Sequence, residues 1–361
     1  MTEERKSYRF LLGVGGIGSG MFFALRGNET LGRNESRAGA ILPRRDFCKL
    51  HIVAHYVAVL TGCPAGGFGV YPIGKVGAEA AGGAMLEQMR RAGMDTRFVE
   101  TTPDRPTLFS VCFLYGDGDG GNITTDDSAS SDVSPGDVDR AVEALDRDLG
   151  GAGGVALAVA EVPLAARKRL LEIARARGWL TAAAFNTAEL GEATESGMLE
   201  LVDLLGVNRD EAAALAGADG GGDVEAIARA AGERLSRANP GIRLCVTAGG
   251  AGAFGWAGGE LEHTPAPAVE VVNTAGAGDA TLAALVVATI AGLPFIRPDR
   301  PRRTSLADAP LETAMDLAAM LAGLAVASED TINFDADAEA IRELARRIGT
   351  DPAALRAALG A

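Results

Sequence analysis

The chain has 361 residues and a formal net charge of −14, with 47% hydrophobic and 23% charged residues. This composition is typical of a globular α/β protein with one large core or two modest domains. So acidic a chain lacks the basic surface that general nucleic-acid binding needs, which excludes nucleic acid as an expected partner. The four cysteines have no paired or metal-binding spacing, so we expect free thiols and a cytoplasmic protein. The apolar run 10–25 is interrupted by glycines, so we expect neither a signal peptide nor a membrane span.

The first third of the chain mixes strands with two helices. Residues 8–14 predict a buried strand, and the turn residues within 20–42 indicate a short hairpin. Asp46 is expected to cap a helix that runs to about residue 60. The remaining segments are predicted as a strand at 69–73, a helix at 78–92, and strands at 97–100, 107–115 and 121–125.

From about residue 134 the chain alternates strands with helices. The predicted strands are 154–160, 179–185, 202–207 and 242–248, and the predicted helices are 135–148, 163–178, 194–201, 209–216 and 223–238. A hairpin at 252–272, a long apolar helix after Asp279, a helix at 311–328 and amphipathic helices within 336–360 follow. Alternation of this kind predicts an α/β fold: a doubly wound, mostly parallel sheet with helices on both faces.

The strongest chemical signal is the segment 273–279 (NTAGAGD), which precedes an apolar helical run. Its glycines permit a tight turn with convergent backbone amides, and the following helix adds the positive end of its dipole. The backbone of Gly276, Ala277 and Gly278 therefore predicts an anion hole for a phosphoryl group. Asp279 can accept the proton of an attacking hydroxyl. The structural alternative is an ordinary glycine-rich loop in which Asp279 only caps the helix.

This segment resembles the C-terminal signature of the ribokinase-like (PfkB) carbohydrate kinases, and three further segments match that family in order. They are residues 73–77 with 92–96 (IGKVG and AGMDT), 207–211 (VNRDE) and 246–253 (VTAGGAGA). The resemblance implies an enzyme that transfers a phosphoryl group from ATP to a hydroxyl of a sugar or sugar-like molecule. It makes Asp279 the general base and the 276–278 backbone the anion hole.

The resemblance also implies ATP and Mg²⁺ as cofactors. The residues that it carries over to the nucleotide are Asn208, Glu211, Thr247, Gly249, Gly252 and Thr274. Glu211 would act on Mg²⁺ indirectly, since hard oxygen ligands suit this ion. Taken alone, the pair Asn208 and Glu211 is better explained as a helix N-cap with an acidic first turn.

The chain departs from the family pattern around the acceptor. Asn273 replaces an Asp that helps relatives to bind a monovalent cation, so cation dependence stays open. The family's Gly-Gly motif at its first long helix and the Asp after its first strand are both missing. Residues 26–51 hold six basic and three acidic residues, which is consistent with an anionic or unusual acceptor and equally with the ordinary surface charge of a solvated lid. The candidate acceptor residues are Gly15, Gly16, Arg33, Asn34, Arg37 and Lys49.

His51 and His55 are four residues apart on a predicted helix and could bind zinc. No third ligand accompanies them, so packing or hydrogen bonding to substrate is the preferred interpretation.

The resemblance implies one kinase domain over residues 1–335, with a small β lid at about 15–42 and 95–125. Residues 336–361 would form a helical extension of the same domain. Exposed lid strands can pair between copies, so a homodimer through the lid is an expected assembly. Three alternatives stay open: a nucleoside kinase, a catalytically silent sensor of a metabolite or nucleotide, and a dinucleotide-binding oxidoreductase. The last rests on the G-x-G-x-x-G pattern at 13–18, although a hairpin rather than a helix is predicted to follow it.

Overall fold

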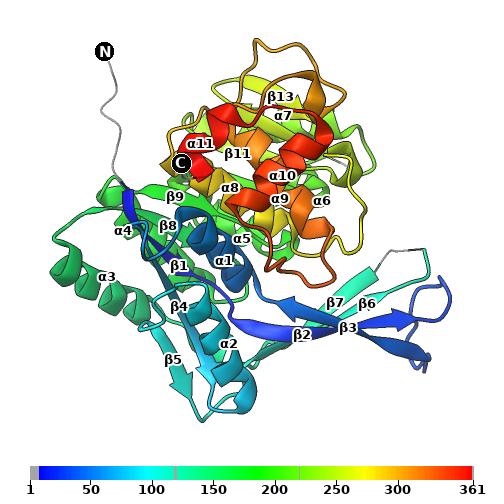
Figure 1. Ribbon diagram of the computed structural model, residues 1–361. Coiled ribbons are helices and arrows are strands. Elements are labelled where there is room, and N and C mark those ends of the chain that lie inside the picture. The colour runs from blue at the N-terminus through cyan, green and yellow to red at the C-terminus, as the bar shows by residue number, and fades with distance from the viewer. Residues whose placement is uncertain (1–7, 118–119, 219, 360–361) are drawn as a thin grey trace.

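The computed structural model describes residues 8–117, 120–218 and 220–359, and its strands form two sheets (Figure 1). The strands are β1 (Tyr8–Val14), β2 (Gly18–Leu25), β3 (Gly39–Phe47), β4 (Gly69–Gly77), β5 (Val99–Thr102), β6 (Leu108–Leu114), β7 (Gly120–Thr124), β8 (Gly153–Ala158), β9 (Leu180–Ala183), β10 (Leu204–Asn208), β11 (Arg243–Thr247), β12 (Ala253–Ala257) and β13 (Glu260–Thr264). The helices are α1 (Lys49–Thr61), α2 (Ala80–Arg91), α3 (Pro135–Leu149), α4 (Leu164–Ala176), α5 (Leu190–Glu195), α6 (Arg209–Ala216), α7 (Val224–Ala238), α8 (Ala277–Ile290), α9 (Ala314–Val326), α10 (Ala338–Ile348) and α11 (Arg356–Leu359).

The larger sheet has nine strands in the order β13-β12-β11-β10-β9-β8-β1-β4-β5. Every neighbouring pair from β11 to β5 is parallel, and β12 and β13 complete one edge as an antiparallel hairpin. Parallel neighbours need long connections, which explains the alternation of strands and helices in the sequence. The predicted doubly wound, mostly parallel α/β fold is confirmed.

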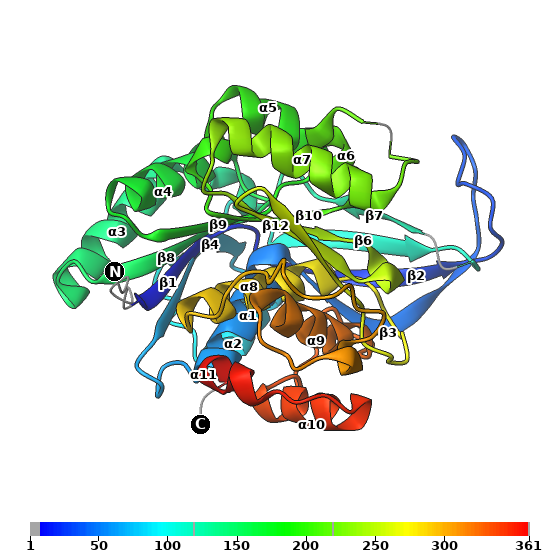
Figure 2. The same ribbon diagram turned by 90° about the horizontal axis from the view of Figure 1, so that it is seen from above.

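Two hydrophobic cores lie on opposite faces of this sheet. Successive side chains of a strand point to opposite faces. In β1, Phe10, Leu12 and Val14 belong to the core that includes α3, α4, α5, α6 and α7. Leu11 of the same strand belongs to the core that includes α1, α2, α8, α9 and α10. Figure 2 shows these two groups of helices on either side of the sheet.

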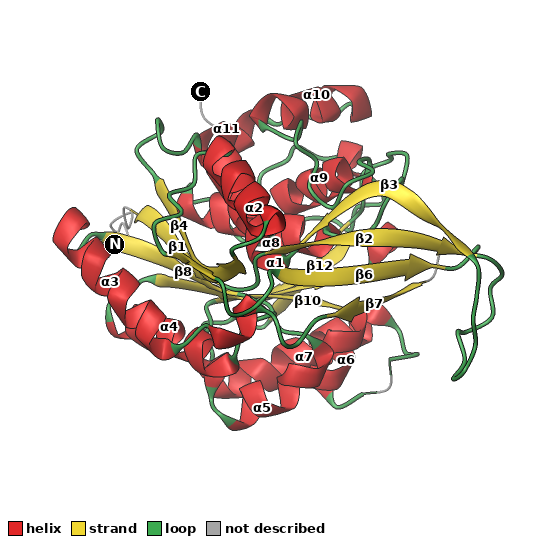
Figure 3. Cartoon of the chain, turned by 90° about the horizontal axis from the view of Figure 1, so that it is seen from below, coloured by secondary structure: helices red, strands yellow, loops and turns green. Residues whose placement is uncertain are grey.

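Four strands form a separate sheet, here called the small sheet, in the order β3-β2-β6-β7. Strands β2 and β6 are parallel, while β3 and β7 are antiparallel edge strands. Figure 3 shows the small sheet extending beyond the larger sheet. The chain enters it from β1 through residues 15–17 and leaves it at Cys48, just before α1.

The topology corrects two expectations. Strand β2, rather than a helix, follows the glycine pattern at 13–18, so the dinucleotide-binding interpretation is wrong. Strand β5 pairs with β4 in the larger sheet, so residues 99–102 do not belong to the small sheet as the predicted lid range implied.

Two helix starts also differ from expectation. Asp46 does not cap α1, because β3 continues through Phe47 and Cys48 is the N-cap. Helix α5 begins at residue 190 rather than 194. A capping box between Asn186 and Glu189 precedes it. Glu189 also forms an ion pair with Arg167, a tertiary contact that cannot be predicted from the local sequence.

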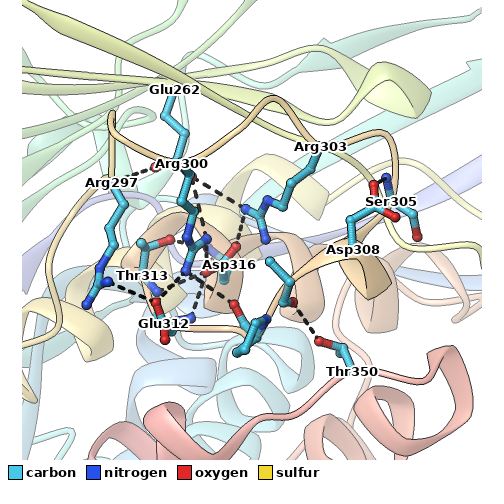
Figure 4. A network of polar contacts seen from close by, with 12 residues as sticks. Glu262, Arg297, Arg300, Arg303, Ser305, Asp308, Glu312, Thr313, Asp316 and Thr350 are labelled. Carbon is cyan, nitrogen blue, oxygen red and sulfur yellow. Dashed lines mark hydrogen bonds and ion pairs between the residues drawn. The ribbon is translucent and has the colours of Figure 1, made fainter.

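The segment between α8 and α9 is held by buried ion pairs (Figure 4). Asp316 of α9 is fully buried and binds both Arg300, at 2.9 Å, and Arg303. Glu262 of β13 lies 3.6 Å from Arg300 and 3.5 Å from Arg303. This network therefore joins the edge strand of the large sheet to α9.

The C-terminal helices pack against the rest of the domain. Residues of α10 and α11 belong to the same core as α1 and α8. Across the ranges that the structure describes, no helix combines the length and the apolar character that crossing a membrane requires.

Candidate active site

A cavity of about 960 Å³ lies between the small sheet and the carboxyl ends of the parallel strands. Glu161, Asn186 and Asn208 line it, and they follow or end β8, β9 and β10. The 273–276 loop and Asp279 line it as well, together with residues of β2, β6 and β7. Ligands of open α/β sheets bind at this edge, so the cavity is the candidate active site.

The start of α8 forms part of the cavity wall. Gly276 is its N-cap with a φ of +83°, and an added Cβ would lie 2.3 Å from the Thr331 carbonyl oxygen. Only glycine therefore fits this turn. The first-turn amides of a helix have no acceptor within the helix, and the dipole makes this end positive. Ala277 and Gly278 belong to the same turn, although their side-chain positions do not line the cavity.

Asp279 lies next to one cation. The Nζ of Lys49, the first residue of α1, is 3.8 Å from Oδ1 of Asp279. Burial raises the pKa of Asp279, and the Lys49 ammonium opposes this rise. In return, the Asp279 carboxylate raises the pKa of Lys49, which therefore stays charged at neutral pH. The pair places a carboxylate base and a fixed positive charge side by side.

Glu161 is a site residue that sequence reasoning missed. Its φ is +77°, and an added Cβ on Gly16 would lie 2.4 Å from the Glu161 Cβ. Burial raises the pKa of Glu161 to about 7, although Lys49 lowers it. The Lys49 backbone N–H donates to Glu161 Oε2 at 3.0 Å. The position of Glu161 just beyond a buried strand, which drew attention to Asn208, was a usable signal in the sequence.

Asn208 and Glu211 form a capping box at the start of α6, as expected from the alternative interpretation of their sequence as a helix N-cap. The Glu211 N–H donates to Asn208 Oδ1 at 2.9 Å, and the Asn208 N–H donates to Glu211 Oε2 at 2.8 Å. Both residues nevertheless line the cavity, as does Thr274. Burial raises the pKa of Glu211. A capping role and a ligand-binding role are therefore compatible here.

The other expected nucleotide residues lie one strand further along. Thr247 ends β11 directly beside Asn208 of β10. Gly249 and Gly252 follow in a turn with φ values of +55° and +92°. These three residues do not line the cavity but continue the same sheet edge. An elongated ligand could therefore extend from the cavity along this edge.

Of the six expected acceptor residues, only Lys49 lines the cavity. Gly15 and Gly16 let the chain pass close to Val159 and Glu161 instead, because a Cβ on either glycine would lie 2.4 Å from these side chains. Arg33, Asn34 and Arg37 lie between β2 and β3, at the far end of the small sheet.

The basic residues of 26–51 therefore do not create a positive pocket. Arg37 binds Glu35 and the carbonyl of Glu29. Arg45 donates through its backbone N–H and its Nε to the two carboxylate oxygens of Asp330, at 2.7 and 2.8 Å. Of the six basic residues in this segment, only Lys49 lines the cavity.

The small sheet contributes further residues that sequence reasoning missed. Asp46, Ser110, Cys112 and Asn122 line the cavity. The Ser110 hydroxyl and, at 3.5 Å, the Cys112 thiol donate to Asp46 Oδ2. They come from three different strands, so only the tertiary fold brings them together.

His51 and His55 are packing residues. Their rings lie edge-on to Phe47 and Phe334, at 5.0 and 5.1 Å between centroids. Burial lowers the pKa of His51 to about 3 and that of His55 to about 4, so both are neutral. Within the described residues, no group of three or more His, Cys, Asp or Glu side chains could hold a metal ion. Any Mg²⁺ would therefore depend on ligands from a bound phosphate and water.

Comparison with known proteins identifies the family and the fold. The family model for pfkB family carbohydrate kinases matches residues 53–338. The structure of a ribokinase from Giardia lamblia superposes with a TM-score of 0.74 at 15% identity, covering 93% of this chain and 99% of that one. A ribokinase from Cryptococcus neoformans var. grubii serotype A, in complex with ADP, gives 0.70 at 20% identity with the same coverage.

A nucleoside kinase from Burkholderia thailandensis, in complex with inosine, gives a TM-score of 0.66 at 17% identity, covering 95% of this chain and 99% of that one. No curated protein sequence matches the chain. At these identities the solved structures establish a shared fold, while the family match rests on the sequence itself.

Proposed function

The chain belongs to the pfkB family of carbohydrate kinases, and on this premise we propose that it transfers the γ-phosphoryl group of ATP to a hydroxyl of a sugar or sugar-like molecule. One observation carries the proposal: Asp279 lies in the first turn of α8, on the wall of a large cavity and 3.8 Å from the Lys49 ammonium. Phosphoryl transfer needs a base and an electropositive anion site in a cavity from which water can be excluded, and the carboxylate, the helix start and the cavity wall here are suited to these roles.

Asp279 acts as the general base. It takes the proton of the acceptor hydroxyl while the hydroxyl oxygen forms a bond to the γ-phosphorus and the bond to the β-phosphate oxygen breaks, releasing ADP. The backbone at 276–278 supports the negative charge that develops on the phosphoryl oxygens. The Lys49 ammonium favours the ionised form of Asp279 and is close enough to help stabilise the charge on the phosphoryl oxygens. The small sheet serves as a lid that excludes water and so limits hydrolysis of ATP.

The donor occupies the sheet edge beside the cavity. Asn208, Glu211 and Thr274 are suited to the phosphate end, and Thr247, Gly249 and Gly252 extend the site along β11. Glu211 fits an indirect contact to Mg²⁺, since it lines the cavity and already accepts one backbone hydrogen bond. Mg²⁺ bound to the phosphates would neutralise charge during transfer. The ADP complex of the fungal ribokinase supports ATP as the donor.

Asn273 supports activity without a monovalent cation. Its side-chain Nδ2 donates to the Glu329 carbonyl at 2.9 Å, and its Oδ1 accepts the Ala275 N–H at 3.1 Å. Both ends of this amide are therefore engaged within the protein, and they tie the anion-hole loop to the segment after α9.

A homodimer through the lid remains part of the proposal. Its two edge strands, β3 and β7, carry the exposed side chains of Ile41 and Ile123, with 66% and 65% of their surface accessible. Exposed apolar edge strands favour pairing with a second copy.

Nucleoside phosphorylation is the second candidate, favoured by the fold shared with a nucleoside kinase in complex with inosine. A catalytically silent sensor would keep the fold and the cavity without needing a base at position 279. Measurable turnover would distinguish either kinase from the sensor. The identity of the phosphorylated acceptor would distinguish a sugar kinase from a nucleoside kinase.

The test is ADP release from Mg-ATP with a panel of sugars, amino sugars, sugar acids, sugar phosphates and nucleosides. We expect turnover with one class, reduced about 10²–10⁴-fold in Asp279→Asn because the base is lost. Asp127→Asn is the matched control, since Asp127 is exposed and does not line the cavity. Equal turnover in Asp279→Asn and wild type would exclude the mechanism, and ligand binding without turnover would favour the sensor.

A further inference from the structure

Asp46 is a buried carboxylate on the cavity wall without a cationic partner. It is 7% exposed and lines the cavity from β3. No Lys, Arg or His side chain of the described residues lies within ion-pair distance of it. The hydrogen bonds that Ser110 and Cys112 donate to Asp46 both reach Oδ2. An ionised carboxylate withdrawn from water is costly unless a cation or further donors reach it.

The neighbouring strand is shaped around this carboxylate. Gly20 of β2 lies opposite Asp46 in the register of the small sheet. An added Cβ on Gly20 would lie 2.6 Å from Asp46 Oδ2 and 2.1 Å from Ser110 Oγ. Any larger residue at position 20 would displace the Asp46–Ser110 pair. The absence of a side chain at Gly20 thus leaves space for the hydrogen-bonded pair of Asp46 and Ser110.

The charges on the cavity wall are strongly unbalanced. In the part of the chain that the structure describes, the lining includes six carboxyl groups and a single basic side chain, Lys49. One of the six, Glu189, binds Arg167 behind the wall at 2.9 Å. Lys49 is committed to Asp279. The negative charge of Asp46 also raises the pKa of both Glu161 and Asp279, which shows that it faces the same space.

We infer that the acceptor substrate carries a protonated amine as well as hydroxyl groups, and that Asp46 binds this amine. An ammonium group has three donors and no acceptor. It is matched by the Asp46 carboxylate and the lone pairs of the neighbouring Ser110 hydroxyl, both on the cavity wall. The same wall rejects sugar phosphates and sugar acids by charge repulsion. This inference rests on the proposed phosphotransferase function and reverses the anionic acceptor that the basic segment 26–51 suggested.

The experiment compares acceptors that differ in one group: a hexose, amino sugars with the amine at different carbons, their N-acetyl derivatives and the corresponding sugar acid. For wild type we expect kcat/KM to be about 10–100-fold higher for an amino sugar than for its parent, as charged hydrogen bonds allow. N-acetylation should abolish the preference because it removes the charge, and the acid should be the poorest acceptor.

Asp46→Asn keeps the size of the side chain and removes its charge. We expect kcat/KM of this variant to be similar for the amino sugar and its parent, mainly because the KM for the amino sugar rises. Activity on the neutral sugar should fall much less than activity on the amino sugar, because only the amino sugar carries the charge that Asp46 is inferred to bind. Asp127→Asn, an exposed neighbour of the cavity rim, should keep the wild-type preference.

Two outcomes would overturn the inference: a wild-type preference for neutral or acidic acceptors, or an equal loss of both sugars in Asp46→Asn. If the variant fails to fold, the wild-type comparison with N-acetylated sugars decides alone. Absence of ADP release with every acceptor would instead contradict the proposed function. Calorimetric binding of the amino sugar and its parent to wild type and Asp46→Asn would then decide the role of Asp46 separately.

Discussion

Single residues in the cavity differ sharply in how easily they hold a charge. Burial opposes ionisation of Glu161 and Asp279, and Lys49 offsets this effect for both. Asp279 has the lysine ammonium at 3.8 Å, whereas Glu161 accepts the backbone N–H of the same residue at 3.0 Å. The two carboxyl groups therefore suit different tasks: Asp279 a base, and Glu161 a group that can accept or donate a hydrogen bond near neutral pH.

Glu161 should leave a measurable signature in the pH dependence of stability. Its pKa is about 7 in the folded protein against 4.5 for an ordinary Glu, so the folded state binds more protons between these values. The free energy of unfolding should then fall as the pH rises from 4.5 to 7. In Glu161→Gln this fall should be smaller by about 3 kcal/mol, measured by urea unfolding at pH 4.5 and 8. The exposed Glu192→Gln is the control, and parallel pH profiles for wild type and Glu161→Gln would contradict the assignment.

At the scale of elements, the start of α8 depends on one glycine and not on its neighbour. Gly276 has a positive φ and meets the Thr331 carbonyl, whereas a Cβ on Gly278 would have no neighbour within 4 Å. We expect Gly276→Ala to lower the free energy of unfolding by at least about 2 kcal/mol. Gly278→Ala should stay within about 1 kcal/mol of wild type, because alanine favours a helix. Thermal and urea unfolding measure the stability of both variants. Equal losses of stability in the two variants would show that the turn can rearrange to accept a side chain at position 276.

The sequence patterns predicted those elements that depend on local chemistry. Buried strands such as β1 and β8, and the helix after Asp279, follow from apolar runs and glycine-rich turns. Elements fixed by distant contacts were misplaced. Asp46 looked like an N-cap, yet its partner is Ser110, 64 residues away and in another strand. Tertiary hydrogen bonds of this kind override the local capping preference.

The same distinction applies to the candidate site. The 273–279 segment was recognisable because its residues are consecutive in the sequence and the turn requires glycine at position 276. The acceptor side was not, because Asp46, Ser110 and Glu161 come from separate segments whose proximity only the fold creates. Net charge over a window of sequence also misled, since side chains such as Arg37 and Arg45 point to partners outside the cavity.

At the scale of the whole molecule, the ion pairs of Asp316 tie the far edge of the large sheet to α9. Removing this carboxylate takes from Arg303, which is 4% exposed, and from Arg300 the nearer of the two carboxylates that they share, and leaves them Glu262. Asp316→Asn should therefore lower the free energy of unfolding by about 3–5 kcal/mol. The pair between Arg302 and Glu225, at 2.9 Å, is exposed, so Glu225→Gln should cost less than about 1 kcal/mol. Similar losses in both variants would show that the network is not buried in solution.

The strand order has a consequence for how the protein acquires its fold during synthesis. Strand β1 lies between β4 and β8 in the finished sheet. Strand β4 is translated soon after β1, but β8 begins only at Gly153, after residues 15–152 have been added. At about 5–20 residues per second, this delay is on the order of ten seconds. Throughout that time an apolar strand edge is available to the wrong partner, so chaperones that bind nascent chains should matter most before the ribosome reaches the middle of the chain.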